Sequence, residues 1–217
     1  MSIKVIITGA TGMVGEGVLF ECLENENISH VLIVNRKHYE LNHPKLKELI
    51  VPDFFQLTNF SDDLNGYDAC FFCAGVSSVG MKEDKYTRIT YDTTIAFAKA
   101  LLDVNSGMVF TYVSGSQTDS TEKGKLMWAR VKGKTENDLV KLPFKAAYNF
   151  RPGAMLPFAG QKNWKGIYKF IARLIKIFSP GIVLTMQEVG RAMINAVLKG
   201  YPKNILEIAD IKVLSKS

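Results

Sequence analysis

Three glycines at short, fixed intervals are the residues best suited to phosphate chemistry. Gly9, Gly12 and Gly15 lie in the run ITGATGMVG, between a short apolar stretch and a segment with helical spacing. The first glycine permits a tight turn, the second lets the backbone approach a pyrophosphate, and the third lets helix and strand pack closely. The run predicts a dinucleotide-binding loop, and the alternative is a strand-to-helix turn that binds nothing.

The peptide groups of this loop are expected to bind the phosphates. Backbone N–H groups, including those of Thr11, Met13 and Val14, should face the phosphate oxygens. The positive end of the following helix adds to this attraction.

The end of the second predicted strand, about twenty residues further on, indicates which dinucleotide is preferred. A site that prefers NAD usually has Asp or Glu here, to hold the ribose 2′-hydroxyl. This chain has Asn35, Arg36 and Lys37 instead. A guanidinium binds a 2′-phosphate through paired hydrogen bonds, and no carboxylate repels it. We therefore expect NADP(H) in preference to NAD(H), unless Arg36 and Lys37 are ordinary surface charges.

Two later strand ends complete the predicted cofactor site. Asp53 and Phe54, in VPDFF, fall where a third strand ends and an adenine is expected. Ala74 and Gly75 end the fourth strand, where a small residue is needed beside the cofactor backbone. Ordinary turn chemistry explains either pair equally well.

Strand-like and helix-like segments alternate along the whole chain. Helices are expected at 14–24, 85–103, 125–136 and 187–200, and in the second of these Ile89, Ile95, Ala96, Ala98 and Leu102 should be buried. Strands are expected at 3–9, 30–36, 45–51, 67–75, 107–115, 146–154 and 205–213. The alternation predicts an α/β fold with a doubly wound parallel sheet. We expect one domain over 1–217, in which 151–217 forms a small substrate-side lobe and the last strand.

Composition excludes several classes of protein. Hydrophobic residues make up 47% of the chain, so disorder is not expected. The net charge of +6 comes without an aromatic-basic repeat, which argues against nucleic acid as a partner. Three cysteines give no disulfide framework, and Cys70 and Cys73 lie in an apolar run, so no metal site is expected. The first residues lack a signal-peptide pattern, which favours a cytoplasmic location.

Residues 162–179 combine apolar side chains at helical spacing with basic side chains on the other side. A cap over a pocket for a small, hydrophobic substrate, or a contact in a homodimer, is the preferred interpretation. Peripheral contact with an anionic membrane is the alternative.

Taken together, TGATGMVG, VNRK, PDF, CAG, VSG, VKGKTE and FRPG resemble the short-chain dehydrogenase/reductase superfamily. The resemblance covers nearly the whole chain and is closest to the atypical branch. Within that branch, the chain is similar to the NADPH-binding Tat-interacting-protein type and to bacterial proteins of the NAD-dependent epimerase/dehydratase-like kind.

This resemblance implies a catalytic serine, tyrosine and lysine. Ser114 or Ser116 matches the serine, because the loop length leaves both open, and Lys132 matches the lysine that also holds the nicotinamide ribose. The tyrosine position is Trp128, whose indole N–H donates hydrogen bonds but is not an acid near neutral pH. Trp128 is therefore expected to shape the pocket rather than to transfer a proton.

The resemblance also places Arg151, Pro152 and Gly153 beside the cofactor. It implies an oxidoreductase that moves hydride between NADP(H) and a carbonyl or alcohol. Because the tyrosine is replaced, the alternative is a weakly catalytic or non-catalytic protein that binds NADP(H) as a sensor or interaction module.

Overall fold

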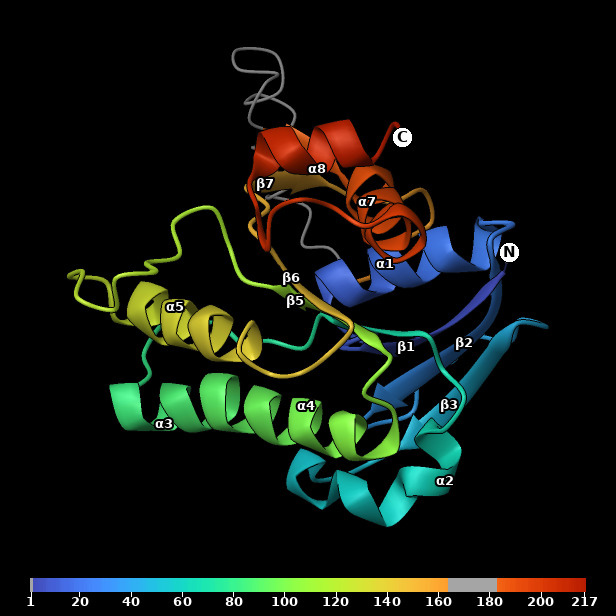
Figure 1. The fold of residues 1–217 in the computed structure, drawn as a ribbon, viewed down its shortest axis with the longest axis horizontal. Coiled ribbons are helices and arrows are strands. Elements are labelled where there is room, and N and C mark those ends of the chain that lie inside the picture. Colours follow the sequence, from blue (N-terminus) through green and yellow to red (C-terminus); the bar gives the residue numbers. More distant parts are fainter. Residues whose placement is uncertain (1, 164–182) are drawn as a thin grey trace.

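A computed structural model describes residues 2–163 and 183–217, which build a seven-stranded parallel sheet (Figure 1). The order along the sheet is β3-β2-β1-β4-β5-β6-β9, and each neighbouring pair is parallel. The strands are β1 (Ile3–Thr8), β2 (Ile28–Asn35), β3 (Leu46–Ile50), β4 (Ala69–Phe72), β5 (Val109–Val113), β6 (Ala146–Phe150) and β9 (Ile205–Leu206). Helices cover both faces, which confirms the predicted doubly wound α/β fold.

The helices form two layers on opposite faces of the sheet (Figure 1). One layer contains α1 (Met13–Glu24), α7 (Met186–Lys199) and α8 (Ile208–Leu214). The other contains η1 (Phe54–Phe60), α2 (Ser61–Leu64), α3 (Glu83–Thr87), η2 (Arg88–Asp92), α4 (Thr93–Val104) and α5 (Met127–Leu139). A second, two-stranded sheet joins β7 (Ala154–Leu156) to β8 (Val183–Thr185).

Alternate residues of the strands supply the two cores between these layers. In β1, Val5 and Ile7 pack into the core on the α1 side, while Ile6 packs into the opposite core. All three side chains are buried, because each face of the sheet is covered. This double burial explains why the strands appear in the sequence as nearly continuous apolar runs.

The order in which the chain adds strands to the sheet reverses between β1 and β4. The chain runs from β1 outward through β2 and β3, then returns to place β4 on the other side of β1. In an open α/β sheet, the carboxyl ends of the strands at such a switch point leave a crevice in which ligands bind. The fold therefore brings the ends of β1, β2 and β4 together around one site.

The predicted strand over 205–213 is correct only for its first two residues. Ile205 and Leu206 form β9, and the rest of the segment is helix α8. Glu207 and Asp210 form a capping box, in which each side chain accepts a hydrogen bond from the other residue's backbone N–H. The cap starts a helix that buries Ile211 and Leu214. The apolar pattern of this segment therefore fits a short helix as well as a strand.

The predicted helix over 85–103 is present as the joined segments α3, η2 and α4. The prediction of which face is buried was wrong. Only Ala98 of the five residues expected inside is buried. The inward face instead carries Tyr86, Thr90, Thr94, Phe97 and Leu101. Two of these side chains are threonines, which a pattern of apolar residues does not reveal.

Of the basic amphipathic stretch at 162–179, the structure describes only Lys162 and Asn163. The predicted cap, dimer contact or membrane contact thus lies outside the described residues. The preceding turn is held against α1: Asn163 donates from its backbone N–H to Glu16 over 2.7 Å, and Gln161 donates to the carbonyl of Met13.

Candidate functional site

The glycine loop is shaped by close backbone approaches. Gly9 has a φ of 74°, and a Cβ there would lie 2.8 Å from the backbone of Ala74. A Cβ on Gly15 would lie 2.2 Å from the carbonyl oxygen of Gly9. Gly12 precedes α1 and makes no side-chain hydrogen bond to the first turn of the helix. The N–H groups of that turn, which includes Met13, therefore face outward where an anion can bind.

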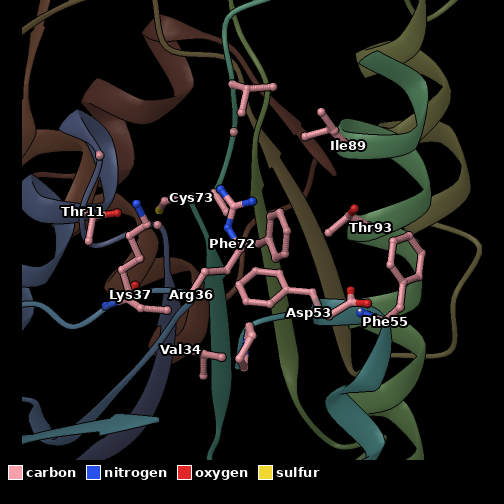
Figure 2. A pocket seen from close by; sticks show the side chains of 18 of the residues that line it. Thr11, Val34, Arg36, Lys37, Asp53, Phe55, Phe72, Cys73, Ile89 and Thr93 are labelled. Atoms are coloured by element: carbon pink, nitrogen blue, oxygen red, sulfur yellow. Dashed lines mark hydrogen bonds between the residues drawn. The ribbon is translucent and has the colours of Figure 1, made fainter. Parts of the chain in front are cut away.

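A cavity of about 1030 Å³ opens at the switch point (Figure 2). Ten of the predicted cofactor residues line it: Gly9, Thr11, Gly12, Asn35, Arg36, Lys37, Asp53, Phe54, Ala74 and Gly75. The remaining predicted residues do not: Met13, Val14, Gly15, Lys132, Arg151, Pro152 and Gly153. The structure thus brings the four predicted turns together around a space large enough for a nucleotide.

Other residues of the wall were missed by sequence reasoning. Some are neighbours of predicted residues at the same strand ends: Val34, His38, Pro52, Phe55, Phe72, Cys73 and Val76. Extending each motif by a residue or two would have found these. Arg88, Ile89 and Thr93 come instead from the η2–α4 segment, where no motif marks them.

The basic end of the cavity contains Arg36 and Lys37. Figure 2 shows Arg36 extending into the space between Thr11 and Asp53. Within residues 2–163 and 183–217, neither Arg36 nor Lys37 has a carboxylate partner. Both cations are thus available to an anionic group.

Glu48, on β3, fixes the turn that presents these cations. Its carboxylate accepts hydrogen bonds from the Asn35 amide over 3.2 Å and from the Tyr39 backbone N–H over 2.9 Å. The same carboxylate pairs with His38. The amide of Asn35 is therefore occupied by a structural contact, although the residue lines the cavity.

The turns after β3 and β4 are held by local hydrogen bonds. Asp53 accepts from the Phe55 backbone N–H over 3.0 Å and so caps η1. Phe54 is buried against Phe97, with ring centroids 5.0 Å apart. Ala74 donates from its backbone N–H to the Thr8 hydroxyl over 3.1 Å. These contacts fix the walls on either side of the crevice.

The predicted catalytic residues form a second group, at the end of β5 and the start of α5. Lys132 donates from Nζ to the carbonyl oxygen of Ser114 over 2.6 Å. Burial lowers the pKa of Lys132 to about 8, although the nearby Glu136 carboxylate acts to raise it. Trp128 is partly exposed, and its ring lies 3.9 Å from where a Cβ on Gly115 would be.

The two candidate serines have different surroundings. Ser114 is buried, and its hydroxyl lies within hydrogen-bond distance of the Glu136 carboxylate and, at 3.1 Å, of the Phe150 carbonyl. Ser116 is exposed, and within the described part of the chain only its backbone N–H is bonded, to the carbonyl of Pro152 over 3.1 Å. The hydroxyl of Ser116 is the one that a substrate can reach.

None of the tyrosines nearest in sequence replaces the missing phenol. Tyr86 and Tyr112 are buried, and burial raises the pKa of both. Tyr91 donates its hydroxyl to Asp138 over 2.8 Å. The raised pKa makes Tyr86 and Tyr112 weaker acids, and the hydroxyl proton of Tyr91 is already used in a hydrogen bond.

Arg151 belongs to a buried ionic network. Its Nε lies 3.0 Å from Glu136, and its Nη1 lies 3.1 Å from the half-exposed Glu207. Its second terminal nitrogen donates to Glu136 and to Ser120. Its guanidinium links α5, β6 and the start of α8, while a role toward a cofactor stays a prediction.

The cysteines carry no sign of redox or metal chemistry. Cys22, Cys70 and Cys73 are free thiols. Burial raises the pKa of Cys70, and raises that of Cys73 to about 12, so neither thiolate forms readily. The described residues bring no three His, Cys, Asp or Glu side chains together as a metal site. Among them, no helix has the length and apolar character to cross a bilayer.

The sheet order and the crevice define a Rossmann-type nucleotide-binding protein. The profile of the NAD dependent epimerase/dehydratase family matches residues 5–124, which is more than half of the chain. The chain belongs to the NAD dependent epimerase/dehydratase family.

Individual relatives agree with this assignment. Protein HTATIP2 of Rattus norvegicus is 26% identical over 197 residues, covering 88% of this chain and 80% of that protein. Protein fmp52, mitochondrial, of Emericella nidulans is 25% identical over 211 residues, covering 90% and 88%. The carbonyl reductase Sniffer of D. melanogaster has the same fold, with a TM-score of 0.69 and 14% identity over 97% of this chain and 98% of that one. The resemblance stated from the sequence is confirmed.

One expectation is corrected by these comparisons. Six of the relatives, the FMP52 proteins of six fungi, are named mitochondrial, and this contradicts the predicted cytoplasmic location. The prediction had rested on the lack of a signal-peptide pattern, which addresses secretion only.

Proposed function

We propose that the protein binds NADP(H) in preference to NAD(H) and acts as an oxidoreductase on a carbonyl or alcohol of a small molecule. The observation that carries the cofactor preference is the pair of cations at the end of β2. Arg36 and Lys37 line the cavity without a carboxylate partner among the described residues. A free guanidinium suits a 2′-phosphate, and Asn35 stands where a site that prefers NAD has a carboxylate to repel it.

The residues present fit the dinucleotide along the cavity. The loop from Gly9 to Gly12 lines the cavity before the first turn of α1, where the pyrophosphate would lie, and Arg36 would hold the 2′-phosphate. A bound nicotinamide supplies or accepts the hydride. Lys132, outside the cavity lining, would hold the ribose as the family resemblance implies, and the exposed hydroxyl of Ser116 would polarise the substrate oxygen in place of the buried Ser114.

Binding measurements test the cofactor preference. Calorimetry with NADPH and NADH should give at least a tenfold tighter constant for NADPH. The Arg36→Ala variant should lose about 10- to 100-fold in NADPH affinity and change little with NADH, because only one ligand has the 2′-phosphate. Lys47→Ala, which removes an exposed lysine of β3 outside the cavity, is the matched control. Equal affinity of the wild type for both cofactors would overturn the proposal.

A non-catalytic NADP(H)-binding module is the second candidate function. Two observations favour it: Trp128 replaces the phenol, and the Ser114 hydroxyl is bound to Glu136. Aldehydes, ketones and quinones offered together with NADPH separate the two functions through absorbance at the nicotinamide band. Oxidation of NADPH with any of them supports the enzyme, whereas tight binding without turnover across the panel supports the module.

A further inference from the structure

Part of the cavity wall comes from a distorted helix. Residues Arg88–Asp92 form the π-helical turn η2, between α3 and α4. Thr93 stabilises the wide turn, because its backbone N–H and its hydroxyl both donate to the carbonyl of Arg88, the hydroxyl over 2.9 Å. Short π segments inside helices occur frequently at functional sites.

The wide turn decides which side chains reach the cavity. In an α-helix, residues five apart lie about 140° apart around the axis. The i→i+5 bonding of a π turn widens the helix and reduces this angle, so such residues come closer to the same face. Arg88 and Thr93 are five apart, and both line the cavity together with Ile89. The distortion therefore directs Arg88 toward the nucleotide pocket.

Arg88 faces an exposed aromatic ring from another segment. Its guanidinium carbon lies 5.9 Å from the ring centroid of Phe55, within the range of a cation–π contact. Phe55 also lines the cavity and is 45% exposed, the one aromatic among the large apolar side chains described as exposed. An aromatic ring left open to solvent beside a cavity is suited to contact a flat ligand.

Arg88 differs from most of the other described arginines in that it has no carboxylate partner among the described residues. Arg130, Arg151 and Arg191 each contact a carboxylate. Arg36 and Arg88 have no carboxylate partner within the part of the chain that the structure describes, and both line the cavity. Two uncompensated guanidinium groups thus face the same ligand space from different segments.

We propose that Arg88 binds the adenine of the dinucleotide by stacking its guanidinium on the purine, and that Phe55 holds Arg88 in place. The inference rests on the proposed function and assigns the adenine end of that site. Phe55 directly follows Asp53 and Phe54, the turn after β3 where the adenine is expected. Because Arg88 contacts Phe55, it lines the cavity at this end. Every base has a π face, and a planar guanidinium stacks on it without needing a phosphate. Arg36 and Arg88 therefore have separate tasks, one on the 2′-phosphate and the other on the base.

Two adenine nucleotides distinguish these tasks. Adenosine 2′,5′-bisphosphate carries the 2′-phosphate, and adenosine 5′-monophosphate lacks it. In calorimetry, Arg88→Ala should weaken both ligands by a similar factor of about 5- to 30-fold, because it removes a contact to the base. Arg36→Ala should weaken only the bisphosphate. Lys85→Ala, an exposed lysine of α3 outside the cavity, should change neither.

A fluorescent variant reports the position of the base directly. In Phe55→Trp, both adenine nucleotides should quench the new indole, and nicotinamide mononucleotide should not. Arg88→Lys keeps the charge but loses the planar group, so it should behave like Arg88→Ala. Because Arg88 and Phe55 are exposed, melting temperatures of these variants should stay close to that of the wild type.

The outcomes separate this inference from the proposed function. If the wild type binds the bisphosphate and Arg88→Ala leaves both ligands unaffected, the adenine assignment is overturned while the cofactor proposal stands. A loss confined to the bisphosphate also overturns it, because Arg88 would then contact the phosphate. If the wild type binds neither the bisphosphate nor NADPH, both proposals fail.

Discussion

Individual side chains decide whether this Rossmann fold is catalytic. The position one turn before Lys132 holds Trp128, whose N–H is not acidic near neutral pH. Ser114 is buried against Glu136, while Ser116 is exposed. Among the described residues, Trp128 therefore leaves this position without the phenol that the family resemblance implies.

Replacing Trp128 by tyrosine should restore that proton donor. We expect Trp128→Tyr to raise kcat for carbonyl reduction about 100-fold, the lower end of the range typical of general acid catalysis. Initial rates of NADPH oxidation with the best carbonyl of the panel provide the measurement. Trp128→Phe is the control and should give no gain. A lower kcat in the tyrosine variant would show that the indole itself assists the reaction.

Lys132 should make stability depend on pH. Burial lowers its pKa to about 8 in the folded protein from the ordinary value of 10.5, so the unfolded chain binds more protons between these values. The contribution of Lys132 to the free energy of unfolding should therefore rise between pH 8 and 10.5, by about 3 kcal/mol in total.

Urea unfolding of the wild type and Lys132→Met at pH 7.5 and pH 10 isolates this effect. Other titrating groups cancel in the comparison, so the wild type should gain stability relative to the variant at the higher pH. A difference between the two proteins that stays constant with pH would show that Lys132 titrates normally.

Residues within sequence motifs were predictable, and residues without them were not. The glycines and Arg36 stand at fixed distances from strands, so geometry alone assigns them to one site. Arg88 gave no such signal, because it reaches the cavity only through a π turn. The burial of Ser114 was hidden too, since it depends on Glu136, twenty-two residues further along the chain.

At the scale of elements, the glycine loop and the ionic network hold the site in different ways. The loop fits β1 against α1 through backbone contacts that exclude side chains. The network joins α5, β6 and α8 through Arg151 and its two carboxylates. The first arrangement positions a ligand, and the second fixes the elements around Ser114.

Two glycines of the loop should respond differently to alanine. A Cβ on Gly15 would lie 2.2 Å from the Gly9 carbonyl oxygen, so Gly15→Ala should lower the free energy of unfolding by about 3 kcal/mol. At Gly12 the corresponding distance is 3.3 Å, and the methyl group would meet the pyrophosphate instead. Gly12→Ala should stay within about 1 kcal/mol of the wild type yet bind NADPH at least tenfold more weakly. Urea unfolding and calorimetry measure the two effects, and unchanged binding in Gly12→Ala would contradict this assignment.

The buried ion pair should matter more than its exposed branch. Glu136 is fully buried beside Arg151, so Glu136→Gln should cost about 3 kcal/mol by leaving a buried guanidinium with one partly exposed partner. Glu207 is half exposed, and Glu207→Gln should cost less than about 1 kcal/mol. Urea unfolding at pH 7 measures both values. Equal losses of stability in the two variants would mean that burial does not determine how much each ion pair of Arg151 contributes.

Element types were predictable except where one pattern fits two structures. Apolar runs between turns identified the central strands, because strands buried on both faces are continuously apolar. The pattern in 205–213 suits a strand or a short helix, and the capping box at Glu207 selects the helix. The inward threonines of η2 and α4 were missed because threonine does not count in a pattern of apolar residues, although the Thr94 hydroxyl donates to the carbonyl of Thr90 within the helix.

At the scale of the molecule, the cavity is assembled from segments distant in sequence. Its walls come from the ends of β1, β2, β3 and β4 and from the η2–α4 segment. The fold class followed from the strand–helix alternation, but this convergence required the strand order. The glycine loop, with Thr11, lies on one side of the cavity, and Ile89 and Thr93 of the opposite helix layer lie on the other (Figure 2).

A ligand in the cavity should stabilise the whole fold. At a free concentration of 100 times its dissociation constant, NADPH should add about 2.7 kcal/mol to the free energy of unfolding, because it binds only the folded state. For a chain of this size, that corresponds to a rise in Tm of about 5–10 °C. NADH at the same concentration should give a smaller rise, and Arg36→Ala should remove the difference between the two cofactors. Because the contacts span both helix layers, a single cooperative transition should shift as a unit. If the ligand raised the melting temperature of only part of the protein, the cavity would lie within one independently folding layer. The assignment of the site to the ends of β1 and β4 together would then be wrong.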